Sequence, residues 1–193
     1  MTGPADRLDG DPVGGPDREQ VARRALALIR DVPDHPVPGV VFKDITPLLA
    51  DANAFAQVCD ALAAPYAAGP GVDVVVGLEA RGFILGAPVA LALGAGFVPV
   101  RKRGKLPYRT VGTSYRLEYG TAEVELHSDG VRPGQRVLVV DDVLATGGTA
   151  AAACELVERI GGVVVGVRLL MELTFLGGRA HLPGRDVTAL LTL

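Results

Sequence analysis

The stretch VLVVDDVLATGGT, residues 137–149, decides the fold of this chain of 193 residues. It begins with a short apolar run rich in β-branched valine, which is typical of a strand buried on both faces of a parallel sheet. Two adjacent carboxylates, Asp141 and Asp142, end that run, and a loop of small residues follows them. Such residues lie at the carboxyl edge of an open α/β sheet, where these folds bind ligands.

The chemistry of this loop indicates a phosphorylated sugar. The carboxylates of Asp141 and Asp142 can accept hydrogen bonds from a pair of ribose hydroxyls. The backbone N–H groups that follow can turn onto a phosphate, and the Ala-rich segment after them supplies a helix N-terminus, which favours an anion. The residues that would carry these N–H groups are Thr146, Gly147, Gly148 and Thr149.

Two nucleotide-binding motifs do not fit the stretch. A Walker A loop needs a lysine after its last glycine, where this chain has Thr149. A Rossmann fingerprint needs its glycines directly after the strand, and the acidic pair occupies that place. The remaining alternative is purely structural, with the acids capping a helix and the glycines turning the chain.

Apolar patterning outside this stretch predicts an α/β fold with a central, mainly parallel sheet flanked by helices. We expect helices over residues 18–30, after Asn53 as N-cap, and over residues 83–93 and 149–160. Strands are expected at residues 72–76, 97–100, 136–140 and 163–171. Two further strands, at residues 114–118 and 122–127, would surround a turn at 119–121.

Composition limits the class of protein. A formal net charge of −3 gives no basic excess with which to bind nucleic acid. The uncharged residues 82–100 approach the length of a membrane span, but glycines and prolines interrupt them, so no membrane segment is expected. Cys59 and Cys154 form no Cys/His cluster, which indicates structural thiols in a reduced, cytoplasmic protein. Residues 1–17 are predicted to be a disordered tail before one domain of residues 18–193.

A second set of charges is predicted to reach the same sheet edge. Arg81 follows the strand at 72–76 within GLEARGF, beside a glycine that opens a helix. An arginine fork of this kind suits a second anion. The strand at 97–100 is followed by the cations Arg101, Lys102, Arg103 and Lys105. A solvated charge run is the alternative interpretation of these four residues.

These motifs together resemble the type I phosphoribosyltransferases, and among them the enzymes that use adenine. The phosphoribosyl diphosphate signature of that family is an apolar strand, two acids and a Thr/Gly loop, as in VLVVDDVLATGGT. The resemblance extends, in the expected order, to PGVVFKDITPLL (38–49), EARGF (79–83), FVPVRKRGKLP (97–107) and SYRLEYG (114–120). It covers nearly all of residues 31–173.

The resemblance implies a type I phosphoribosyltransferase fold with a small N-terminal hood and a mobile lid loop over residues 104–120. Asp141 and Asp142 would hold the ribose hydroxyls, and Mg²⁺ would arrive bound to the phosphosugar. The 5′-phosphate would lie on Ala145, Thr146, Gly147, Gly148 and Thr149. The diphosphate would bind Arg81 and, partly across a homodimer, Arg101, Lys102 and Lys105.

Adenine would be bound by Val41, Phe42 and Lys43, with Phe42 stacking on the purine. Family members usually have arginine where this chain has Lys43. We therefore expect the affinity for adenine to differ from that of those family members. The catalytic residues implied by the resemblance are Glu118, Tyr119 and Arg81, with Glu118 assisting proton removal from adenine.

The reaction implied is purine salvage, in which adenine and phosphoribosyl diphosphate give AMP and diphosphate. Enzymes for 6-oxopurines usually carry an aspartate at the position of Ala145, which favours adenine here. One alternative is a phosphoribosyltransferase for hypoxanthine, guanine, xanthine or orotate. The other is a transcriptional regulator of the same fold that binds the phosphosugar without turnover, but such regulators carry an added DNA-binding domain, for which we see no room.

Overall fold

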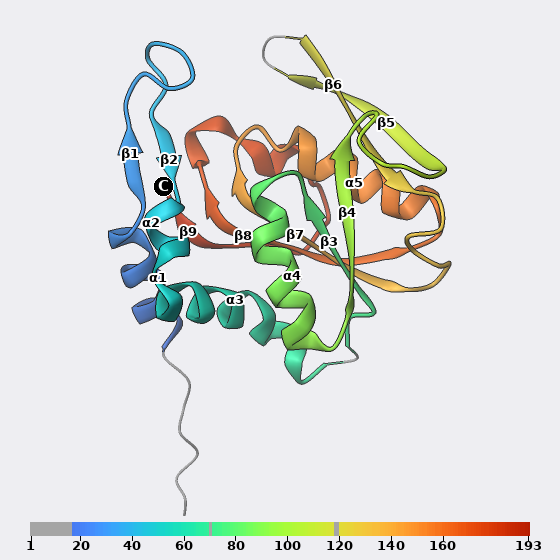
Figure 1. The fold of residues 1–193 in the computed structure, drawn as a ribbon, viewed down its shortest axis with the longest axis horizontal. Coiled ribbons are helices and arrows are strands. Elements are labelled where there is room, and N and C mark those ends of the chain that lie inside the picture. Colours follow the sequence, from blue (N-terminus) through green and yellow to red (C-terminus); the bar gives the residue numbers. More distant parts are fainter. Residues whose placement is uncertain (1–16, 70, 118–119) are drawn as a thin grey trace, which may run out of the picture.

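The computed structural model describes residues 17–69, 71–117 and 120–193, and a seven-stranded sheet forms its centre (Figure 1). The strands lie in the order β5-β6-β4-β3-β7-β8-β9, in which neighbours from β4 to β9 are parallel and the pairs with β6 are antiparallel. Their bounds are β3 Val74–Leu78, β4 Gly96–Lys102, β5 Thr110–Leu117, β6 Gly120–His127, β7 Arg136–Leu144, β8 Val163–Glu172 and β9 Val187–Thr192.

Helices cover both faces of this sheet. On one face α3 packs on α4, α1 packs on α3, and α4 contacts β3 and β7, whereas α5 packs on the other face. The bounds are α1 Arg18–Ala27, α2 Thr46–Ala50, α3 Ala52–Ala67, α4 Arg81–Leu93 and α5 Gly148–Arg159. The short 3₁₀ helices η1 (Thr174–Leu176) and η2 (Gly178–His181) follow β8.

Successive residues of the central strands alternate between two apolar cores, as the pleat of a strand requires. Leu138 and Val140 of β7 belong to the core under α3 and α4, while Val137 and Val139 belong to the core under α5. All four are fully buried. The prediction that this strand is buried on both faces is confirmed, and so is the α/β fold with a mainly parallel sheet.

The N-terminal part of the chain differs from the prediction. The helix predicted to reach Arg30 ends at Ala27, because residues Arg30–Val32 form β1 and pair with β2, Phe42–Asp44, in an antiparallel hairpin. This hairpin is the small N-terminal hood of the fold (Figure 1). The predicted N-cap Asn53 is also wrong, since the Asp51 side chain accepts the hydrogen bond from the Ala54 N–H at 2.9 Å and α3 begins at Ala52.

The C-terminal part adds elements that the sequence pattern did not reveal. Strand β9 pairs with β8 in parallel and completes the sheet.

Strand β7 runs four residues beyond the predicted end at Val140, so the acidic pair lies within the strand. Strand β5 begins at Thr110, inside the stretch predicted to be a lid, and the mobility of that lid stays a prediction.

Within the described residues, no helix combines the length and the apolar character needed to cross a bilayer. The predicted disordered tail, residues 1–17, lies outside the described residues except for Asp17, which caps α1.

One buried cation joins three elements at the edge of the sheet. Arg168 of β8 is 5% exposed, and its guanidinium carbon lies 4.8 Å from the centre of the Tyr66 ring of α3. Its Nη2 donates to the Asp186 carboxylate at 2.5 Å, just before β9. This hydrogen bond lowers the pKa of Asp186 below its usual value of 3.8.

We predict that Asp186→Asn lowers the free energy of unfolding at pH 7 by about 1–2 kcal/mol, because the buried Arg168 loses a charged acceptor. The folded pKa lies below the unfolded one, so this contribution is complete well above the usual pKa of 3.8 and is lost as the pH falls through the folded pKa. Urea denaturation of both proteins between pH 3 and 7 measures the difference. A difference that grows at low pH would contradict the assignment.

Candidate active site

The acidic pair lies at the carboxyl edge of the sheet, in the wall of a cavity of about 460 Å³. Asp142 is 3% exposed, and its backbone N–H donates to Asp141 Oδ1 at 2.9 Å. Burial, followed by the neighbouring Asp142 carboxylate, raises the pKa of Asp141. Two carboxylates held side by side in this way can accept hydrogen bonds from two vicinal hydroxyls.

Helix α4 approaches this pair closely enough to exclude a side chain at Gly82. A Cβ built there would lie 2.7 Å from Asp141 Oδ1 and 2.9 Å from the Val140 carbonyl oxygen. The preceding residue, Arg81, also lines the cavity. The missing side chain at Gly82 therefore lets the first turn of α4 lie against the acids of β7.

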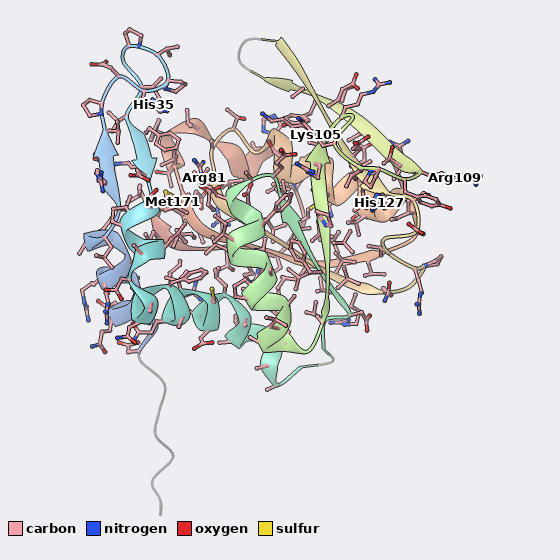
Figure 2. All side chains as sticks on the ribbon, in the orientation of Figure 1. His35, Arg81, Lys105, Arg109, His127 and Met171 are labelled. Carbon is pink, nitrogen blue, oxygen red and sulfur yellow. The ribbon has the colours of Figure 1, made fainter. Side chains whose placement is uncertain are left out.

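Arg81 joins the acidic pair to the N-terminal hairpin (Figure 2). Its Nε donates to Asp142 Oδ2, and its guanidinium carbon lies 4.9 Å from the centre of the Phe42 ring on β2. His35 meets the same ring edge-on at 5.1 Å. The Glu79–Ala80 peptide, two residues before Arg81, is cis. The structure thus brings together a predicted diphosphate residue, a predicted ribose residue and a predicted base residue.

The loop after β7 forms the floor of the cavity. The cavity lining from this loop and the start of α5 consists of Ala145, Thr146, Gly147, Thr149 and Ala150. Gly147 has φ +83°, and a Cβ on it would lie 2.2 Å from the Gly178 carbonyl oxygen. A Cβ on Gly178 would lie 2.3 Å from the carbonyl oxygen of Ala145. Two glycines therefore let the start of η2 support the loop from behind, with the α5 N-terminus beside the cavity.

Tyr115 of β5 reaches the same loop. Its hydroxyl and the Thr149 hydroxyl are 3.0 Å apart and share a hydrogen bond. Tyr115 also lines the cavity, together with Lys102 of β4. The outer hairpin of β5 and β6 therefore contributes to the site from the side opposite Arg81.

Glu79 organises the start of the basic cluster. Its carboxylate accepts from Arg101 Nε at 3.2 Å and from the Lys102 N–H at 3.0 Å. Burial tends to raise the pKa of Glu79, but the bonds from Arg101 and Lys102 outweigh it and lower the pKa. Arg101 also donates to the Lys105 carbonyl oxygen at 3.1 Å. Of the three predicted diphosphate residues in this cluster, only Lys102 is among the described residues that line the cavity.

The predicted adenine segment lies at the start of β2, with Val41 just before the strand, and apart from the cavity lining. Val41 is 49% exposed, and Lys43 Nζ lies 2.7 Å from Asp31 Oδ1 across the hairpin. Phe42 contacts Arg81 as described above. Among the described residues that line the cavity, none comes from this segment.

Two predicted catalytic residues, Glu118 and Tyr119, lie outside the described residues. Burial raises the pKa of Cys59 to about 12 and that of Cys154 to about 11, which disfavours the thiolate form that a nucleophile needs. No group of three His, Cys, Asp or Glu side chains within the described ranges could hold a metal ion.

The acidic pair, the loop after β7 and the N-terminus of α5 form a cavity whose chemistry suits a phosphorylated sugar, and comparison with known proteins identifies the family of the chain. Residues 48–174 match the family model for the phosphoribosyl transferase domain. The chain belongs to this phosphoribosyltransferase family. A relative from Acidothermus cellulolyticus that is named adenine phosphoribosyltransferase is 65% identical over 89% of this chain and 96% of its own.

Solved structures give the same result for the fold. The adenine phosphoribosyltransferase of Rhodothermus marinus superposes with a TM-score of 0.86 at 51% identity, covering 91% of this chain and 99% of that one. The Saccharomyces cerevisiae enzyme, crystallised with adenine and an iminoaltritol bisphosphate, has a TM-score of 0.84 at 38% identity over 90% and 99% of the chains. The predicted type I phosphoribosyltransferase fold is therefore confirmed.

Three residues of the site were not identified from the sequence: Glu79, Tyr115 and Gly178. Glu79 and Tyr115 stand inside motifs that we recognised, but a carboxylate and a phenol in those positions have no spacing that reveals their partners. Gly178 is separated from Gly147 by thirty-one positions. The close approach of these two glycines leaves no signal in the sequence, because it depends on how the segment that carries Gly178 folds back against the loop after β7.

We predict that Gly82→Ala lowers the free energy of unfolding by about 1–3 kcal/mol, because its methyl group would overlap Asp141 and the β7 backbone. Gly96→Ala is the matched control, since a Cβ there has only the Asp73 carbonyl oxygen nearby, at 3.7 Å. We expect the control to change stability by less than about 0.5 kcal/mol. Urea denaturation of the two variants measures both effects, and equal losses would show that Gly82 is not specially constrained.

Proposed function

We propose that this phosphoribosyltransferase acts in purine salvage and transfers the 5-phosphoribosyl group of phosphoribosyl diphosphate to adenine, giving AMP and diphosphate. The observation that carries the proposal is one cavity that combines the acidic pair, the phosphate loop and Arg81. The choice of base is supported by the relatives, which are named adenine phosphoribosyltransferase. Ala145, which lines the cavity, supports it further because it supplies no carboxylate for a 6-oxopurine.

The proposed reaction forms a bond between adenine N9 and C1′ while the bond from C1′ to the diphosphate oxygen breaks. The electron pair of that bond leaves with the diphosphate, so negative charge grows there as the ribose gains oxocarbenium character. Arg81 and Lys102 both line the cavity in which this charge would develop. Fixed cations in a site closed to water stabilise such charge strongly.

Binding of the sugar is divided between two parts of the β7–α5 segment. Asp141 and Asp142 accept hydrogen bonds from the ribose hydroxyls in this proposal. The N–H groups at the start of α5 donate to the 5′-phosphate, since the first N–H groups of a helix have no partner within it. Tyr115 can hold the Thr149 hydroxyl in place for the same phosphate.

We propose that Mg²⁺ binds together with the diphosphate substrate. Mg²⁺ prefers oxygen ligands and commonly takes one or two carboxylates together with substrate phosphates. Asp141 and Asp142 are carboxylates in the cavity wall, so the residues fit this mode of binding. When bound, the cation would neutralise charge on the leaving diphosphate.

We also propose a homodimer in which Arg101 and Lys105 act across the subunit interface. Lys105 is absent from the lining of this chain's own cavity as far as the structure describes it, which is what a residue serving the partner's site requires. Light scattering of the purified protein measures the mass directly. A monomer at assay concentrations would contradict this part of the proposal.

The function is tested by measuring diphosphate release with each of five bases in turn. We expect turnover with adenine and less than about one hundredth of that rate with hypoxanthine, guanine, xanthine or orotate, because a site built for one base edge leaves polar groups unpaired with another. Turnover with hypoxanthine but not adenine would overturn the choice of base. Binding of phosphoribosyl diphosphate without turnover of any base would indicate a regulator.

We propose Glu118 as the residue that assists proton removal from adenine, with Tyr119 beside it. Glu118→Ala should lower kcat by about a hundredfold or more, the usual contribution of a general base. The KM for phosphoribosyl diphosphate should stay within about twofold, since the sugar is bound elsewhere. Steady-state kinetics with both substrates measures this, and Glu118→Gln is the matched control for size. An unchanged kcat would remove Glu118 from the reaction.

A further inference from the structure

The connection between β4 and β5, residues 103–109, carries Lys105 and follows Lys102 directly. It forms no helix or strand, and its backbone makes few hydrogen bonds: the Arg103 N–H donates to the Glu123 carbonyl oxygen at 3.2 Å, the Lys105 N–H donates to the Lys102 carbonyl oxygen at 3.3 Å, and the Arg109 carbonyl oxygen accepts from the Ser128 N–H at 3.0 Å. Its position relative to the cavity must therefore be set by contacts with other elements. This matters for any role of the two lysines, because a long, flexible side chain on a loosely held backbone binds an anion weakly.

A buried carboxylate from β6 supplies these contacts. Glu125 is 6% exposed, and its Oε1 accepts hydrogen bonds from the backbone N–H groups of Lys105 and Leu106 at 3.0 and 3.1 Å. Its Oε2 accepts from the Thr110 hydroxyl at 3.2 Å, where β5 begins. One side chain thus holds both the middle and the end of the connection.

The electrostatic state of Glu125 fits this role. Burial tends to raise the pKa of a carboxyl, but the hydrogen bonds from Leu106, Thr110 and Lys105 outweigh burial and lower the pKa of Glu125. The carboxylate is therefore ionised at neutral pH. An ionised carboxylate is an acceptor on both oxygens, which is what two N–H groups and a hydroxyl require.

The strand register places Glu125 at the junction with the active site. Glu125 lies opposite Arg101 in the antiparallel pair of β4 and β6, and Val124 lies opposite Lys102. On the other side of β4, Glu79 accepts from Arg101 and from the Lys102 N–H. The basic segment is consequently held at its start by Glu79 and over the following residues by Glu125.

We infer that Glu125 is a positioning residue for diphosphate binding, which fixes the backbone of residues 103–110 and so places Lys102 and Lys105. It does not touch the reacting atoms and is absent from the described lining of the cavity. The inference rests on the proposed function, because the lysines are assigned to the diphosphate there. The inference adds a role for a carboxylate near an anion site. Glu125 would strengthen diphosphate binding because it fixes the backbone that carries the lysines.

The test compares Glu125→Gln with Glu123→Gln. Glutamine has the same size but presents an NH₂ group to one set of donors, so we expect the KM for phosphoribosyl diphosphate to rise about tenfold. The KM for adenine should change by less than about twofold, because the base does not contact this segment. Glu123 lies two residues away on β6, forms an exposed ion pair with Arg103 at 2.5 Å, and should leave both constants unchanged.

Hydrogen exchange separates positioning from general loss of structure. In Glu125→Gln we expect faster exchange of peptides that contain residues 103–110, with unchanged exchange in β3 and β7. Faster exchange throughout would mean that the variant is misfolded. In that case Thr110→Val, which removes a hydroxyl from an exposed residue, must raise the same KM for the inference to stand.

A double-mutant cycle with Lys105→Ala tests whether Glu125 acts through the lysines. If it does, Glu125→Gln should raise the KM by less in the Lys105→Ala background than in the wild type. Additive effects, or an unchanged KM in Glu125→Gln, would overturn the inference. Wild-type protein without turnover of adenine would instead overturn the proposed function, so the two failures are distinct.

Discussion

The contact between Arg81 and Asp142 joins the parts of the molecule on which the active site depends. Asp142 belongs to the central strand β7, Arg81 begins α4, and the Arg81 guanidinium lies over Phe42 of the N-terminal hairpin. The carboxylate is buried, so it would be costly without a charged partner. The residue proposed for the ribose, the residue proposed for the diphosphate and the face of an aromatic ring are therefore held within one cluster.

Close backbone approach is the second constraint, and glycine meets it on both sides of the cavity. Gly82 lets α4 lie against the acids, while Gly147 and Gly178 let η2 lie against the phosphate loop. Any side chain at these positions would push the two neighbouring elements apart. The basic segment is held differently, because Glu79 accepts from the Arg101 side chain and the Lys102 N–H, and Glu125 accepts from the N–H groups of Lys105 and Leu106.

The sequence allowed most of the sheet to be predicted, together with the position of the acidic pair and its loop at the sheet edge, and the reason is local. A strand buried on both faces must be apolar at every position, and a phosphate loop must be small, so residues 137–149 carry their own evidence. The strands of the β1–β2 hairpin were not predicted, and its first residue was assigned to a helix, because the hairpin is defined by cross-strand pairs such as Lys43 with Asp31, twelve positions apart. Strand β9 was missed since it is defined only by pairing with β8.

The sequence by itself determined the class of fold, the order of the motifs and the resemblance to the adenine enzymes, because each of these lies in short runs of neighbouring residues. Only the tertiary structure decided how the charges are paired: Arg81 with Asp142, Arg101 with Glu79, and Glu125 with the backbone of Lys105 and Leu106. These partners are separated by about twenty to sixty positions. Which acid meets which donor depends on strand order and register, and these follow from packing the whole sheet between its helices.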